Sequence, residues 1–140
     1  MRRILVGVDG SDPAAKASQM AAEIAIRFGA KLTLAYVVPR LVLPPDAYGL
    51  STAEVEAEHR EHAEKLLAHA ASELGETGVQ ADTLVLSGAP AESLAEAAHA
   101  SDVDLVVAGS RGRGAVARML LGSVTDRLVH ISPKPVLVVR

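Results

Sequence analysis

The chain alternates short apolar runs with longer segments of helical periodicity, and this alternation limits the folds open to it. The apolar runs are Arg3–Val8, Lys31–Val38, Val79–Leu86, Leu105–Ala108 and Val136–Val139. Between them, apolar residues recur at helical spacing in Ala14–Phe28, Thr52–Leu74, Ala91–Ala100 and Ser123–Ile131. Strands that alternate with helices form parallel sheets covered on both faces, so we predict a single α/β domain with a doubly wound, five-stranded parallel sheet.

The first and last helices carry signals at their ends. Asp12 before Pro13 predicts an N-cap and the first helical position, and Gly29 predicts where that helix ends. Ser123 and Asp126 have the spacing of a capping box. The predicted buried faces of the first two helices are Ala17, Met20, Ala21, Ile24 and Phe28, and Val55, His59, Ala63, Leu66, Leu67, Ala70 and Leu74.

A glycine-rich, basic stretch, Asp104–Thr125, is the strongest functional signal. It has glycines at 109, 112, 114 and 122 and arginines at 111, 113 and 118. Glycines let backbone N–H groups approach an anion, and a helix that begins near Ser123 adds the positive end of its dipole. We therefore predict a phosphate site here; the alternative is that the glycines only shape a surface loop.

Two standard nucleotide motifs do not explain this stretch. Residues 112–117 match G-x-G-x-x-A, but a Rossmann unit needs an acidic residue about 20 positions later, at the end of the next strand. In this chain the next strand, Val136–Val139, is followed by Arg140 and not by an acidic residue. The P-loop motif is absent from the sequence, so we do not predict ATP hydrolysis of that kind.

Asp9, directly after the first strand, is a second candidate. A carboxylate at the end of a strand can accept hydrogen bonds from ribose hydroxyls or hold a metal near phosphates. It can equally be an Asx-turn residue that satisfies local N–H groups. The residues alone leave both interpretations open.

Composition and charge narrow the remaining classes. The absence of cysteine excludes disulfides and thiolate chemistry. With a net charge of -3, the chain lacks the overall positive charge that would attract nucleic acid. The sequence has neither a signal peptide nor an apolar segment long enough for a membrane span, so we expect a cytoplasmic protein. The histidines lack a metal-binding pattern and no nucleophile is paired with a base, so we predict no catalytic residue and no protein-held metal.

The last apolar run, Val136–Val139, has two possible places in the sheet. It either lies inside the sheet under its own helices or forms an edge that invites pairing. We predict a homodimer through this strand.

From end to end, the sequence resembles the universal stress protein family. The resemblance rests on ILVGVDGS, LTLAYVV, VLSGAPAESL, DLVVAGSRGRG and PVLVV. Its most specific part is G-x-x-G, nine residues, then G-S, met by Gly109, Gly112, Gly122 and Ser123, which is typical of the ATP-binding members. The implied fold is Rossmann-like, with strand order 3-2-1-4-5, similar to the adenine nucleotide alpha hydrolases.

The resemblance also implies roles for single residues. Asp9 would bind the ribose, Val37 would bind adenine through its backbone, and Gly109 would lie against the ribose. The phosphates would be held by Gly112, Gly122, Ser123 and Val124. Arg111 varies within the family, so its predicted role rests on charge alone. The family pattern further implies Mg2+ or Mn2+ bound through the phosphates, and a homodimer through the last strand.

We therefore predict a dimeric, ATP-binding stress-response module, with AMP or ADP as other ligands. Nucleotide occupancy would change the loop around residues 110–121 and its surface for an unidentified protein partner. A slow ATPase or phosphotransfer enzyme is one alternative, although only Asp9 and Ser123 could position water or accept phosphate. A scaffold domain that binds no nucleotide is the other.

Overall fold

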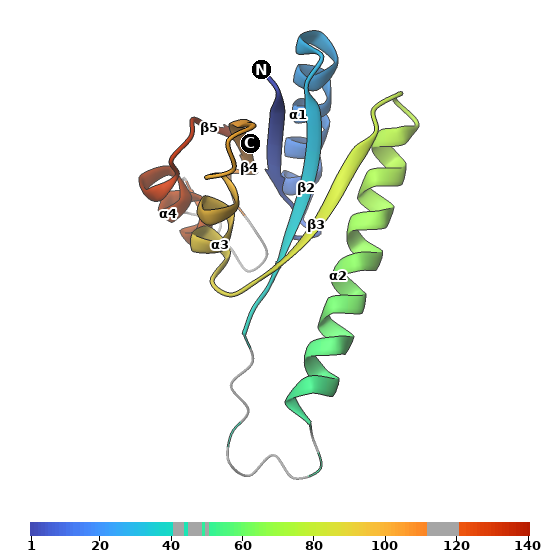
Figure 1. Ribbon diagram of the computed structural model, residues 1–140, viewed down its shortest axis with the longest axis vertical. Helices are drawn as coiled ribbons and strands as arrows, with labels where there is room; N and C mark the ends of the chain where they lie inside the picture. Colours follow the sequence, from blue (N-terminus) through green and yellow to red (C-terminus); the bar gives the residue numbers. More distant parts are fainter. Residues whose placement is uncertain (41–43, 45–48, 50, 112–120) are drawn as a thin grey trace.

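The strands form one parallel sheet in the computed structural model, which describes residues 1–40, 44, 49, 51–111 and 121–140. The strand order is β3-β2-β1-β4-β5, which confirms the predicted fold class and order (Figure 1). Each pairing between neighbouring strands is parallel. The strands are β1 (Arg3–Gly7), β2 (Lys31–Val38), β3 (Ala81–Ser87), β4 (Val103–Gly109) and β5 (Val136–Val139).

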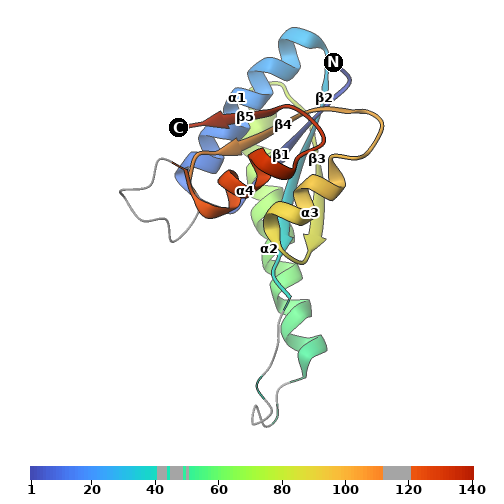
Figure 2. The ribbon, with the colours of Figure 1, turned by 90° about the vertical axis from the view of Figure 1, so that its left-hand side faces the viewer.

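Helices cover both faces of this sheet. The described residues form α1 (Asp12–Phe28), α2 (Thr52–Gly75), α3 (Pro90–Ala97) and α4 (Ser123–Ile131). Strand residues alternate between two core clusters, because Ile4 and Val6 lie in one cluster and Leu5 in the other. The first cluster includes residues of α1 and α2 and the second residues of α3 and α4, on opposite sides of the sheet (Figures 1 and 2). Within the described ranges, no helix is both long and apolar enough to cross a membrane.

The face of α1 that packs on the sheet consists of small residues. Of the predicted face, Ala17 and Ala21 are buried, whereas Met20 and Phe28 are exposed, so that part of the prediction is wrong. Small side chains let a helix approach a sheet closely, and this favours the alanine stripe over the larger apolar residues beside it. The buried residues of α1 are Ala14, Ala17, Ser18, Ala21, Ala22 and Ala25.

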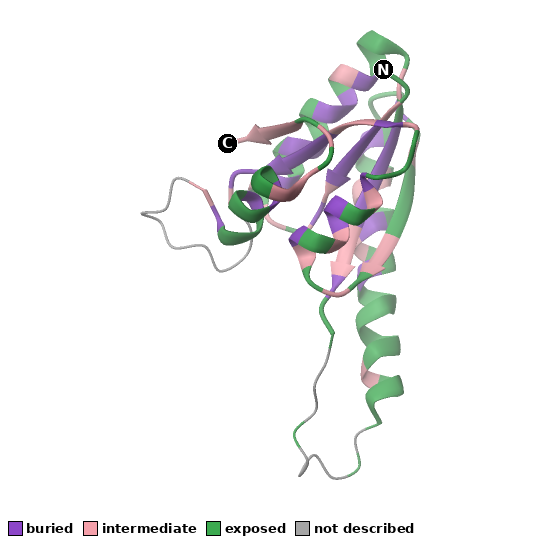
Figure 3. Cartoon of the chain, turned by 60° about the vertical axis from the view of Figure 1, so that its left-hand side comes forward, coloured by how far each residue is buried: buried purple, intermediate pink, exposed green. Residues whose placement is uncertain are grey.

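The buried residues of helix α2 all lie from Ala63 to its C-terminal end. Its buried residues are Ala63, Leu67 and Leu74, while Leu66 and Ala70 pack partly against the same core. The turns of α2 before Ala63 extend past the ends of the strands and are exposed, apart from the half-buried Val55 (Figure 3). His59, predicted on the buried face, lies in these turns and is exposed.

The predicted caps of two helices are wrong by one residue. The N-cap of α1 is Ser11, whose Oγ accepts a hydrogen bond from the Ala14 N–H at 3.3 Å, and Asp12 is already helical. The N-cap of α4 is Gly122, which has no side chain to cap the helix, so the predicted Ser-x-x-Asp capping box is not formed. Helix α3 ends at Ala97 rather than at the predicted Ala100.

At the amino ends of the strands, the Arg3 side chain of β1 bonds to residues of β2 and β3 and to the residue before β4. Its Nε donates to Asp102 at 2.8 Å, and its guanidinium also contacts Asp82 at 3.1 Å and the Thr33 hydroxyl at 2.7 Å. The hydrogen bond from Arg3 holds the pKa of Asp102 below its ordinary value, while Asp102 and Asp82 raise the pKa of Arg3. This cluster lies at the edge of the sheet opposite to the predicted ligand site.

Replacement of Arg3 by Met should lower stability at pH 7 and weaken its dependence on acid. Because the pKa of Asp102 is lowered on folding, the pair contributes stability above the unfolded Asp pKa of about 3.9. That contribution is lost as pH falls through the lowered folded pKa. Urea unfolding of both proteins at pH 7 and pH 3 measures it, with Arg60→Met in the exposed Arg60–Glu64 pair as the control. The same pH dependence in wild type and Arg3→Met would contradict the expectation.

Candidate functional site

The candidate site lies at the carboxyl ends of β1 and β4, where the strand order changes direction. From β1 the chain continues to β2 on one side, and β4 later pairs on the other. Val6 of β1 pairs with Val107 of β4, so the segments after these neighbouring strands emerge at the same edge. In open α/β sheets this switch point is where ligands bind.

Asp9 follows β1 and forms the turn into α1. Its Oδ1 accepts hydrogen bonds from the Ser11 N–H at 2.9 Å and from the Ser11 hydroxyl at 2.5 Å. Ser11 in turn caps α1. The Asx-turn role that the sequence left open is therefore present, and it holds a half-buried carboxylate at the switch point. The predicted ribose contact stays a prediction.

Gly109, the last residue of β4, lies against the first turn of α1. A Cβ at this position would be 2.7 Å from the carbonyl carbon of Pro13 and 2.9 Å from the Ala14 nitrogen. Backbone atoms cannot move aside as the end of a long side chain can, so only glycine fits. Packing alone therefore requires this glycine, whatever contact it makes with a ligand.

Three hydrogen bonds join the end of β4 to the start of α4 and to β5. The Gly122 N–H donates to the Ser110 carbonyl at 2.7 Å, and the buried Thr125 hydroxyl donates to the Gly109 carbonyl at 2.7 Å. The Ser110 N–H donates to the Val139 carbonyl, also at 2.7 Å. Because the Gly122 N–H is used in this way, it is not a phosphate donor in this conformation.

The other predicted phosphate residues lie around this junction. Ser123 and Val124 are exposed in the first turn of α4, where N–H groups have no acceptor within the helix. Arg111 is half-buried directly after Ser110. Gly112 and most of the loop 110–121 lie outside the described residues.

Val37 lies where the pairing between β1 and β2 has ended. The last pair is Gly7 with Ala35, whereas β2 and β3 stay paired as far as Val38 and Ser87. On the β1 side, the Lys31 N–H donates to the Arg2 carbonyl and the Ala35 carbonyl accepts from the Val8 N–H. On the other side, the Val38 carbonyl accepts from the Gly88 N–H beyond β3. In a parallel strand, successive residues direct both of their backbone groups to alternate sides. The N–H and C=O of Val37 therefore point to the side of β1, beyond the pair of Gly7 with Ala35.

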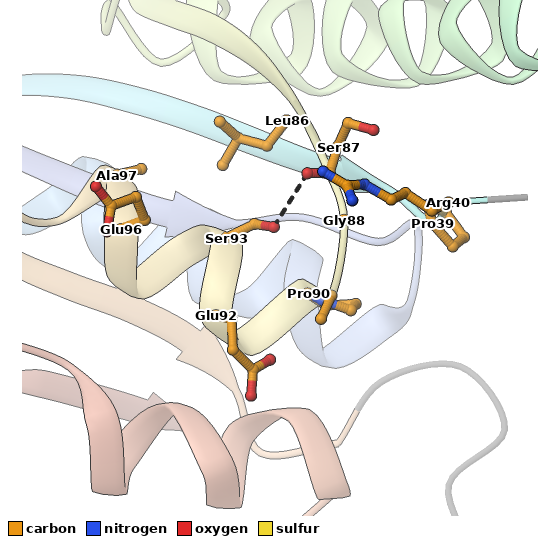
Figure 4. A pocket seen from close by; sticks show the side chains of 11 residues that line it. Pro39, Arg40, Leu86, Ser87, Gly88, Pro90, Glu92, Ser93, Glu96 and Ala97 are labelled. Atoms are coloured by element: carbon orange, nitrogen blue, oxygen red, sulfur yellow. Dashed lines mark hydrogen bonds between the residues drawn. The ribbon is translucent and has the colours of Figure 1, made fainter.

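A separate pocket of about 810 Å³ opens beside α3 (Figure 4). None of the predicted site residues lines it. Glu92 on its wall pairs with Arg127 of α4 at 3.0 Å, and this hydrogen bond lowers the pKa of Glu92. We therefore keep the ends of β1 and β4, and not this pocket, as the candidate ligand site. The pocket residues are Pro39, Arg40, Leu86, Ser87, Gly88, Ala89, Pro90, Glu92, Ser93, Glu96 and Ala97.

Sequence reasoning missed Ser110 and Thr125, which connect the elements of the site. Both are buried polar residues, and each bonds to backbone distant in the sequence. Their one sequence signal is position, because Ser110 follows Gly109 and Thr125 stands in the first turn after Gly122. Among the described residues, no group of three or more His, Asp and Glu side chains could hold a metal ion.

These features define a doubly wound α/β domain with a candidate ligand site at its switch point. The model of the universal stress protein family matches residues 1–140, and the chain belongs to this family.

Similar proteins support the assignment along the whole chain. A universal stress protein of Thermus aquaticus, named from its place in the QAH/OAS sulfhydrylase 3' region, is 39% identical over 141 residues, which cover 99% of this chain and 98% of the relative. The solved UspA of Lactobacillus plantarum superposes with a TM-score of 0.87 at 29% identity, covering 99% and 97% of the two chains. A universal stress protein solved in complex with cAMP has a TM-score of 0.75 at 28% identity, with 99% and 97% covered.

Replacement of Gly109 by Ala should destabilise the protein by about 1–3 kcal/mol, because the new Cβ would push β4 away from α1. Chemical denaturation measures the loss. Gly75→Ala is the matched control, since nothing lies within 4 Å of a Cβ there and α2 gains a better helix former. Equal stability of Gly109→Ala and wild type would show that the two elements are not in close contact.

Proposed function

We propose that this protein is a homodimeric regulatory module that binds an adenine nucleotide, with ATP as the principal ligand. The orientation of the Val37 backbone is the observation that carries the proposal. Membership of the universal stress protein family and the relative solved with cAMP support the same ligand class.

The base would bind at the end of β2. A backbone N–H and C=O that point past the last pair of β1 with β2 match the acceptor N1 and the N6 amino donor of adenine. Guanine presents a donor at N1 and an acceptor at O6, so the same backbone groups disfavour it. Aromatic residues are 2% of the chain, so the base would lie between aliphatic groups.

The ribose and phosphates would lie across the ends of β1 and β4. The Asp9 carboxylate stands at the switch point to accept hydrogen bonds from ribose hydroxyls. The first turn of α4, which has no side-chain cap, would offer the N–H groups of Ser123 and Val124 to phosphate oxygens. Arg111, Gly112 and Gly122 complete the proposed set, with Gly122 acting through its lack of a side chain.

A divalent cation would enter with the nucleotide. Mg2+ prefers oxygen ligands and is commonly held by substrate phosphates with few protein groups. We propose that Mg2+ or Mn2+ bridges the phosphates of bound ATP, where it would offset their charge. This fits a site whose phosphate donors are mainly backbone N–H groups.

The homodimer would form through the outer edge of β5. The Pro135 carbonyl accepts from the Val106 N–H of β4, and the Val139 carbonyl accepts from the Ser110 N–H directly after β4. The alternation of the strand therefore turns the N–H groups of Val136 and Val138 outward. A four-residue strand is too short to form a stable interface alone. Exposed apolar residues flank the sheet on both faces, Met20 and Phe28 on α1 and Val129 on α4, and we propose that they extend the interface.

ATP in excess of its Kd should raise the melting temperature, because it binds only the folded protein. At 100 times Kd the expected gain is about 2.7 kcal/mol, which is roughly 5–10 °C for a domain of this size. A panel of ATP, ADP, AMP, cAMP, NAD and GTP at millimolar Mg2+ and pH 7 ranks the ligands. Asp9→Ala and Gly122→Val should each weaken ATP binding at least tenfold, by about 1.4 kcal/mol.

The backbone of Gly122 has φ -68°, a conformation that valine can adopt without backbone strain. Gly75→Ala is again the control and should bind like wild type. A protein that no nucleotide stabilises would be the scaffold alternative. Phosphate release abolished by Asp9→Asn would instead indicate a slow ATPase.

Val138→Pro should convert the dimer to a monomer. Proline removes the outward N–H of β5 and leaves the bonds from β5 to β4 intact. Thr83→Pro is the matched control, because it removes an outward N–H from the opposite edge strand, β3. Sedimentation equilibrium measures the mass of each variant. A monomeric wild type, or a Val138→Pro dimer as tight as wild type, would exclude this interface.

A further inference from the structure

Thr125 forms a buried hydrogen bond between two elements of the candidate site. Its side chain is 5% exposed, and its Oγ1 lies 2.7 Å from the carbonyl oxygen of Gly109. Within the described part of the chain, the other buried polar residues are Ser18, Thr33 and Ser110. Ser18 bonds within its own helix, to Ala14, and Thr33 belongs to the Arg3 cluster.

The Gly109 carbonyl needs a hydrogen-bond donor from outside the sheet. The Val106 N–H donates to the carbonyl of Pro135, which directly precedes β5, so the alternation of β4 turns the carbonyl of Gly109 toward β1. The pairing of β1 with β4 ends at Val6 and Val107, before this carbonyl is reached. The Thr125 hydroxyl therefore takes an acceptor that a longer β1 would have used, and a buried carbonyl without a donor would be costly.

This bond fixes the first turn of α4 relative to the rest of the site. Thr125 directly follows Ser123 and Val124, whose N–H groups are the proposed phosphate donors. Gly109, at the other end of the bond, lies against the first turn of α1, which follows Asp9. The hydrogen bond thus connects the proposed phosphate donors to the segment that carries Asp9, the residue proposed to bind ribose, without a ligand being present.

We infer that Thr125 is a positioning residue for the phosphates of the nucleotide, acting through its hydrogen bond to Gly109. The inference rests on the proposed function. Binding of a base at Val37 does not pass through this contact, so loss of the hydroxyl should weaken ligands with phosphates and spare adenosine. Serine keeps the hydroxyl, whereas valine keeps the shape and loses the donor.

The test compares Thr125→Val and Thr125→Ser with wild type by calorimetric titration with Mg2+-ATP and with adenosine. Thr125→Val should weaken ATP binding about tenfold, because the first turn of α4 would hold the binding conformation only part of the time, and change adenosine binding less than about twofold. Thr125→Ser should bind both ligands like wild type. Thr77→Val is the matched control, because its hydroxyl also donates to a carbonyl, that of Leu74 at 2.6 Å, at the far end of α2.

Amide hydrogen exchange without nucleotide gives a second, independent readout. The amides of residues 124–126 should exchange faster in Thr125→Val and at the wild-type rate in Thr125→Ser. Unchanged ATP affinity in Thr125→Val, an equal loss for ATP and adenosine, or a serine variant as weak as the valine variant would each overturn the inference. If wild type bound no nucleotide, the proposed function would fail, and unchanged exchange would then overturn the positioning role as well.

Discussion

The close contact between the end of β4 and the start of α1 is the constraint on which the candidate site depends. At Gly109 two stretches of backbone meet with no room for a Cβ. This contact places the Asp9–Ser11 turn beside the last residue of β4, and Thr125 then brings α4 to the same point. Three segments far apart in the sequence thus reach one edge of the sheet, which is held at its other edge by Arg3.

Most of the fold follows from the alternation of apolar runs with helical segments. Parallel sheets buried on both faces need continuous apolar strands, and these are visible without a structure. Helix faces and caps were less predictable. The alanines of α1 pack on the sheet, whereas Met20 and Phe28 are exposed. The helical periodicity of apolar residues does not show which side of a broad apolar face the strands will cover. Ser11 rather than Asp12 caps α1, since both residues suit an N-cap and the Asp9 turn decides between them.

The glycine and serine pattern predicted where the candidate site lies, but not how its parts are connected. Gly122 uses its N–H to bond Ser110, and Thr125 bonds Gly109, sixteen residues earlier. Such bonds depend on where strands stop pairing, and the orientation of the Val37 backbone depends on the same register. A sequence shows which residues can donate or accept hydrogen bonds. The positions where strand pairing ends determine which backbone groups remain available to do so.

The alanine stripe of α1 has a consequence for how the protein tolerates change. Ala17, Ala21 and Ala25 contribute little volume, so the large strand residues fill the space and the helix stays near the sheet. An added methylene anywhere along this stripe would lift the helix as a whole, because interiors are densely packed. Its first turn would move with it, along with Asp9 and the contact at Gly109. The spacing between helix and sheet is therefore a determinant of ligand affinity, controlled by residues that no ligand would touch.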